Sequence, residues 1–73
     1  MIALMVWACL TASPTECKVM MIAQGFSDTN QCFVFKDIML AGWLTQHTNI
    51  KLREGTGPIC TNNPQWLMYR FGA

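Results

Sequence analysis

Four cysteines are the residues of this 73-residue chain with the clearest chemistry, and they lie at positions 9, 17, 32 and 60. An even number of cysteines in so short a chain is typical of a disulfide framework, and four cysteines allow three connectivities. A domain of this size can bury only a small core, so covalent cross-links are a common source of its stability. We therefore predict two disulfides.

The segments around the cysteines favour one of the three connectivities. Cys9 and Cys17 flank a short polar segment that contains Pro14 and separates two apolar runs of strand length. If these runs form a β-hairpin, a Cys9–Cys17 disulfide joins its two strands. Cys32 is then left to pair with Cys60. We predict that each pair has its Cα atoms within about 7 Å of each other.

A metal site is the alternative use of the same residues, with four cysteines or with three cysteines and His47 as ligands. Structural zinc sites usually draw their ligands from tight Cys-x-x-Cys pairs, and this spacing does not occur in the sequence. The missing spacing argues equally against a thioredoxin-like redox site. The sequence therefore predicts no metal and no cofactor.

Groups for acid-base or nucleophilic catalysis are few and scattered. A nucleophile pair can be written from Cys32 and His47, but no third group is placed to orient the base. Cys32 is better explained as half of a disulfide, and His47 as a residue that interacts with the dipole at the end of a helix. The carboxylates are spread along the chain at Glu16, Asp28, Asp37 and Glu54. We predict that the protein is not an enzyme.

The elements that must position these residues form the pattern of a small α+β domain. Residues 1–10 and 17–24 are apolar runs that predict a hairpin. Asp28 and Gln31 fit a capping box, so a helix should begin there and end near residues 45–47. Residues 49–54 alternate between apolar and polar side chains, which predicts a strand with one face in water.

We therefore predict a disulfide-stapled β-β-α-β domain over residues 1–61. An apolar C-terminal arm over residues 62–73 follows it, with Asn62, Asn63 and Pro64 as a hinge.

The composition suggests that the protein has a partner. Apolar residues make up 52% of the chain and charged residues only 12%, whereas soluble domains carry roughly 25% charged residues. A net charge of +1 provides no basic patch for nucleic acid. The two apolar runs, residues 1–10 and 32–44, are shorter than the roughly 20 residues that span a bilayer. A signal peptide has Lys or Arg before its apolar stretch, and neither residue precedes the first run. The surplus apolar surface therefore predicts protein partners.

The predicted helix and the C-terminal arm are the segments expected to bind them. The helix is apolar nearly all round, so one small sheet can cover only part of it. The arm contains aromatic and Arg side chains of the types enriched at interface hot spots. The alternative is that the arm folds back on its own domain. The predicted partner-binding residues are Phe33, Leu40, Leu44, Trp66, Leu67, Tyr69, Arg70 and Phe71.

The spacing of several residues resembles that of small uncharacterised proteins encoded by tailed phages and alphaproteobacteria. The pattern is Cys9-Leu10-x-Ala12-x-Pro14-x-x-Cys17-Lys18, then Cys32, then Ala41-x-Trp43-x-x-x-His47, then Cys60. In those proteins the last Cys follows an aromatic, basic strand, whereas here Pro58 and Ile59 precede Cys60 and residues 62–73 are additional. The resemblance implies the cysteine framework and a phage setting, and it carries over no catalytic residue.

The apolar surplus and the phage-like pattern together predict a virion structural protein. It would be a capsid decoration or head–tail accessory subunit of a tailed phage, located in the virion, which clamps neighbouring subunits. The expected partners are the major capsid protein or a neighbouring virion protein and further copies of this chain. The first alternative is an extracytoplasmic, cysteine-stapled binding protein at a cell envelope, and a second is a small zinc or redox module. Disulfides could form once particles leave the reducing host.

Overall fold

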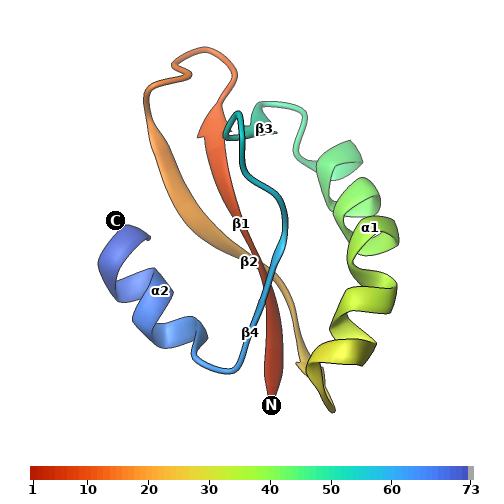
Figure 1. Cartoon of the computed structure of the whole chain (residues 1–73). Helices are drawn as coiled ribbons and strands as arrows, with labels where there is room; N and C mark the ends of the chain where they lie inside the picture. The colour runs from red at the N-terminus through yellow and green to blue at the C-terminus, as the bar shows by residue number, and fades with distance from the viewer. Residues whose placement is uncertain (73) are drawn as a thin grey trace.

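The α+β fold is present in the computed structural model, which describes residues 1–72. The order is strand, strand, helix, strand, strand, helix (Figure 1). The six elements are β1 (Ile2–Leu10), β2 (Cys17–Phe26), α1 (Thr29–Gln46), β3 (Ile50–Leu52), β4 (Ile59–Thr61) and α2 (Pro64–Phe71).

Strand β1 is the centre of the sheet. It pairs antiparallel with β2 along one edge, and on its other edge with both β3 and β4. β4 pairs with Ala3 to Met5, and β3 with Ala8 to Leu10. The side chains from Ile2 to Val6 are all buried, because β1 is covered on both faces. A continuous apolar run is typical of such a strand.

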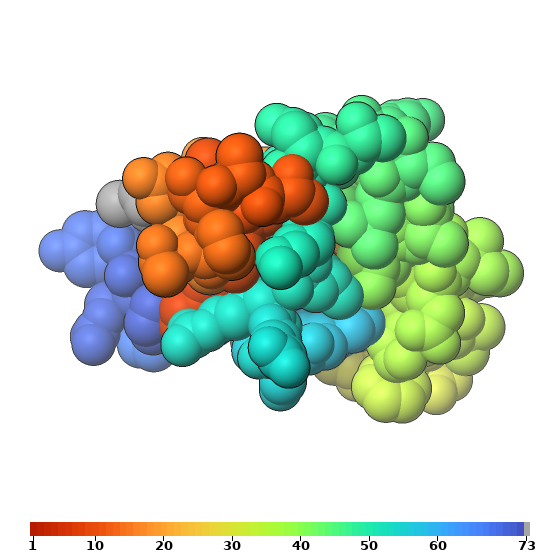
Figure 2. Space-filling view, turned by 90° about the horizontal axis from the view of Figure 1, so that it is seen from above, coloured from red at the N-terminus to blue at the C-terminus, as the bar shows by residue number. Residues whose placement is uncertain are grey.

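The two helices lie on opposite faces of this sheet (Figure 1). In the view from above, the strands lie between α1 on one side and α2 on the other (Figure 2). Alternate side chains of β1 supply the two halves of the core. Ile2 and Leu4 join the cluster that contains Cys32 of α1, while Ala3 and Met5 join the cluster that packs against α2.

The start of α1 follows the predicted capping pattern with one shift. Asp28 is the N-cap, and its carboxylate accepts a hydrogen bond from the backbone N–H of Gln31 at 2.8 Å. In a standard capping box the Gln31 side chain would accept from the backbone N–H of the N-cap residue. Here its Oε1 accepts from the backbone N–H of the residue before the cap, Ser27, at 2.7 Å. The two bonds fix the direction in which the chain leaves β2.

Replacing Asp28 with Ala should lower the free energy of unfolding by about 1 kcal/mol, since the first helical amides lose their acceptor. The matched control is Asp37→Ala, whose carboxylate pairs with Lys36 on the surface and should contribute little. Urea unfolding of both variants measures the difference. Equal losses would mean that the cap does not stabilise α1.

Helix α2 is the helix that the sequence analysis did not predict. Asn63 and Pro64, interpreted as a hinge, are its N-cap and first residue, and the Asn63 side chain accepts from the backbone N–H of Trp66 at 3.2 Å. Asn before Pro suits a helix start because Pro has no amide to satisfy and its φ is already helical. The predicted arm is therefore largely a helix. Its last residue, Ala73, lies outside the described residues.

Candidate protein-binding surfaces

Both predicted disulfides are present. Cys9 and Cys17 are directly opposed on β1 and β2, with their Cα atoms 4.0 Å apart. Cys32, in the first turns of α1, is bonded to Cys60 of β4 at a Cα separation of 6.1 Å. The first bond joins the hairpin strands, and the second ties α1 to the far edge of the sheet. With all four sulfurs bonded, none offers a thiolate to a metal or a substrate.

The single histidine closes the end of α1. The backbone N–H of His47 donates to the carbonyl of Leu44, and its ring Nδ1 lies 2.8 Å from the carbonyl of Trp43. The imidazole also stacks on the Trp43 ring, with centroids 4.3 Å apart. Since Cys32 is in a disulfide, His47 has no thiol to activate. Its contacts are those of a residue that caps a helix.

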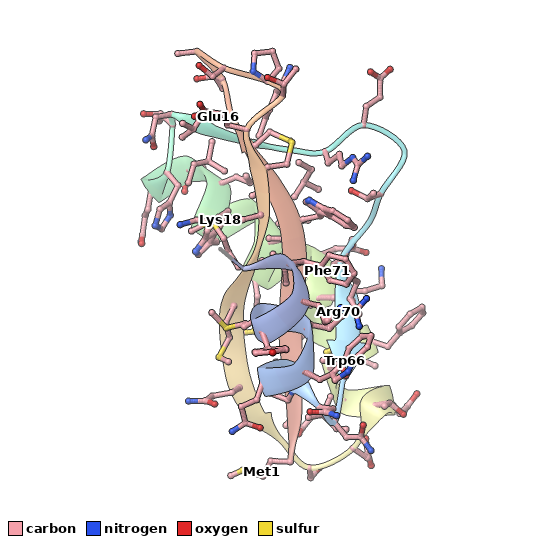
Figure 3. All side chains as sticks on the ribbon, turned by 90° about the vertical axis from the view of Figure 1, so that its left-hand side faces the viewer. Met1, Glu16, Lys18, Trp66, Arg70 and Phe71 are labelled. Atoms are coloured by element: carbon pink, nitrogen blue, oxygen red, sulfur yellow. A yellow bond between two sulfur atoms is a disulfide. The ribbon has the colours of Figure 1, made fainter. Side chains whose placement is uncertain are left out.

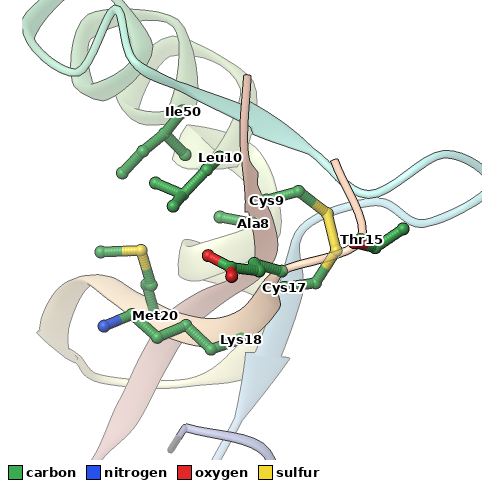
Figure 4. Close-up of a pocket in the computed structure, with 9 residues that line it drawn as sticks. Ala8, Cys9, Leu10, Thr15, Cys17, Lys18, Met20 and Ile50 are labelled. Atoms are coloured by element: carbon green, nitrogen blue, oxygen red, sulfur yellow. A yellow bond between two sulfur atoms is a disulfide. The ribbon is translucent and has the colours of Figure 1, made fainter. Parts of the chain in front are cut away.

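Two open hollows flank the tip of the hairpin. Figure 4 shows one of them, with the Cys9–Cys17 disulfide on one side and Leu10 and Ile50 on another. Its titratable side chains are Glu16 and Lys18, and it contains no His or Ser. Among residues 1–72, no three His, Cys, Asp or Glu side chains are grouped to hold a metal ion. The distinctive chemistry of the surface therefore lies in its apolar side chains.

The outer side of α1 carries an apolar surface. Cys32 is fully buried, and Trp43, three turns later on the same side, is half-buried. Val34 and Ile38 lie on the opposite side at about 100° per residue, and they are 64% and 74% exposed. Phe35 and Met39 are also exposed. In the described chain, neither helix is long and apolar enough to cross a bilayer.

The predicted partner-binding residues of α1 differ in how exposed their side chains are. Phe33 is 64% exposed, with the Lys36 ammonium 4.7 Å from its ring centroid. Leu40 and Leu44 are half-buried on the flank that turns toward the sheet. Ile38, which was not among the predicted residues, is the most exposed of these side chains at 74%, and Val34 is as exposed as Phe33. The helix is apolar nearly all round, so the sequence pattern does not show which of its sides faces the sheet. The Cys32–Cys60 bond helps to fix that side.

Helix α2 divides its large side chains between two sides. Leu67 and Phe71, one turn apart, pack against the core cluster of Ala3, Met5 and Val19. The structure therefore has the arrangement in which the tail folds back on its own domain. Trp66 and Tyr69 are 50% and 85% exposed, and Arg70 is exposed as well. These three are the predicted arm residues that remain available to a partner.

A stack of rings and cations stiffens this surface. The Arg53 guanidinium lies 4.4 Å from the Trp7 ring centroid, and the Trp7 and Phe71 centroids are 5.1 Å apart. On the outer side, Phe71 meets Trp66 edge-on at 6.3 Å, and Arg70 lies 5.5 Å from the Trp66 ring. Figure 3 shows the order of Trp66, Arg70 and Phe71 along α2. Trp66 is therefore held by its neighbours before any partner binds.

Comparison with protein-family models, curated proteins and solved structures finds no match to this chain.

Proposed function

We propose that this protein is a small structural subunit of a tailed-phage virion, a capsid decoration or head–tail accessory protein that binds neighbouring protein subunits. The observation that carries the proposal is the pair of apolar surfaces on opposite sides of one sheet. One is the outer side of α1, with Val34 and Ile38, and the other is the outer side of α2, with Trp66 and Tyr69. A subunit with two such surfaces can bridge two neighbours.

The α2 surface has the composition of an interface anchor. Trp, Tyr and Arg are the residue types that most often dominate binding energy, and Trp66, Tyr69 and Arg70 occur here within two turns. Because Trp66 is already held by Phe71 and Arg70, little side-chain freedom is lost when a partner covers it. The phage setting itself rests on the sequence resemblance.

The two disulfides favour a second candidate, an extracytoplasmic binding protein at a cell envelope. Disulfides persist in oxidising surroundings and are reduced in the cytosol. A released virion and a cell envelope both satisfy this requirement, so the cross-links alone do not separate the two settings. The two settings are separated by where the chain is located.

Density-gradient fractionation of lysates from the cell or phage that encodes the chain should find it on particles that contain capsid protein. The double variant Trp66→Ala with Tyr69→Ala should leave the particle fraction, because both side chains are exposed anchors. The control is Phe33→Ala, an exposed aromatic on the other helix, which should stay on the particles if α2 is the anchor. Recovery of the chain with the cell envelope supports the second candidate. Recovery as free protein, in neither the particle fraction nor the envelope fraction, contradicts both proposals.

A further inference from the structure

The outer side of α1 has a regular set of small and large side chains. Val34, Ile38, Ala41 and Thr45 are spaced by four, three and four residues, the spacing of a heptad seam between two helices. All four are exposed, and none is charged. Asp37, with its side chain 80% exposed, lies at the edge of the set, where it can remain in water. We call these four residues the α1 seam.

The α1 seam is complementary to itself when a second copy is turned around. Its spacing reads the same in both directions, so an antiparallel pair sets Val34 of one copy at the height of Thr45 of the other. Ile38 likewise meets Ala41. The N-terminal half is bulky and the C-terminal half is small, so each bulky residue faces a small one. Antiparallel packing also brings each helix N-terminus near the partner's C-terminus, where the dipoles attract.

Two local features allow another helix to approach closely. A Cβ at Gly42 would meet no atom within 4 Å apart from its chain neighbours and the backbone of its own helix, so the domain's own packing does not require a glycine there, although glycine is unfavourable inside a helix. The Thr45 hydroxyl donates to the carbonyl of Gly42 at 2.7 Å. Its polar group is therefore satisfied within the helix and can be covered without loss of a hydrogen bond.

The exposed area is sufficient for a weak, specific dimer. Val34 and Ile38 of the seam are 64% and 74% exposed, and Phe35 beside it is 45% exposed, so most of the apolar outer side of α1 is in water. Pairing along a helix about 27 Å long would bury on the order of 1,000 Å² in total, near the lower limit for specific interfaces.

We propose that two copies of this chain associate through antiparallel α1 seams to form a two-fold dimer. The proposal refines the proposed structural role, because it assigns one of the two surfaces to a second copy and leaves α2 for other subunits. Since α1 and α2 cover opposite faces of the sheet, the dimer carries two α2 surfaces on its outer sides. It would then attach to an assembly bivalently.

The test is the mass of the purified, oxidised protein in solution. Sedimentation equilibrium across a range from micromolar to millimolar should show a rise from the 8.2 kDa chain to twice that mass. Ile38→Asp and Ala41→Lys should each weaken the dimer at least tenfold, because each places an unpaired charge in the seam. Both sites are exposed in the monomer, so the melting temperature should barely change. The control Met68→Asp, on α2, should dimerise normally.

Mixing the Ile38→Asp and Ala41→Lys variants should restore a dimer. In an antiparallel pair the introduced carboxylate faces the introduced ammonium, and the second Ile38–Ala41 contact remains native. A parallel pair would not bring the two charges together. A protein that is monomeric at millimolar concentration, or variants that dimerise as the native chain does, would overturn the proposal. Either result leaves the α2 attachment untouched, because no other partner is present in the experiment.

Discussion

Removing the two side chains with which α2 covers the sheet is expected to destabilise the whole domain. The double variant Leu67→Ala with Phe71→Ala should lose about 3–5 kcal/mol, since each truncation leaves a cavity against Ala3, Met5 and Val19. A chain of this size has a total stability of only about 4–11 kcal/mol. The variant should therefore be close to unfolding at room temperature, as urea unfolding followed by circular dichroism will measure.

The matched control is the outer pair of the same helix. Trp66→Ala with Tyr69→Ala removes at least as much side-chain volume, from side chains that are 50% and 85% exposed. It should cost less than about 1 kcal/mol, because substitutions on the surface are usually near neutral. If both double variants unfold at the same urea concentration as the native chain, α2 does not complete the core. The arm would then be free to leave the domain and pack on another chain.

Loss of the Cys32–Cys60 disulfide is expected to cost more than loss of the Cys9–Cys17 disulfide. The bonded residues are 28 and 8 positions apart. On chain-entropy grounds, the longer loop should contribute about 3.5 kcal/mol and the shorter about 2.5 kcal/mol. The burial of Cys32, which is 0% exposed, adds to the first loss when it becomes Ala. The two double Cys→Ala variants, compared by urea unfolding, measure the order.

The reduced native protein provides the control for this comparison. It lacks both bonds but keeps all four sulfurs, so it should unfold more easily than either double variant. A larger loss from the Cys9→Ala with Cys17→Ala variant would contradict the order. That result would mean that the hairpin bond organises the native sheet rather than only restricting the unfolded chain.

The two-sided cover of the sheet links the stability of the domain to its proposed role. Leu67 and Phe71 hold α2 against one face, which leaves Trp66 and Tyr69 pointing outward on a fixed helix. Cys32 holds α1 against the other face, which leaves Ile38 outward. The same contacts that complete a small core therefore orient both apolar surfaces. A rigid surface loses little conformational entropy when it binds a partner.

The local pattern of the sequence was enough for the elements with strong signals. The apolar run of β1, the Asp28 cap and the alternation around Ile50 each predict their own segment, because capping hydrogen bonds and the period of the apolar residues are set within the segment itself. The disulfide pairing followed as well, since Cys9 and Cys17 flank a hairpin. The helix at Pro64 was missed, although Asn63 followed by Pro64 is a helix start, and Leu67 and Phe71 are one turn apart.

Only the tertiary structure decided which side chains are left for a partner. A helix that is apolar all round has no face chosen by its own sequence, so the sheet and the Cys32–Cys60 bond select the side that is buried. That choice exposes Val34 and Ile38 and partly covers Leu40 and Leu44. The same holds for α2, where contact with Met5 and Val19 divides Leu67 and Phe71 from Trp66 and Tyr69. Burial is a property of the packed domain, since it depends on neighbours that are distant in sequence.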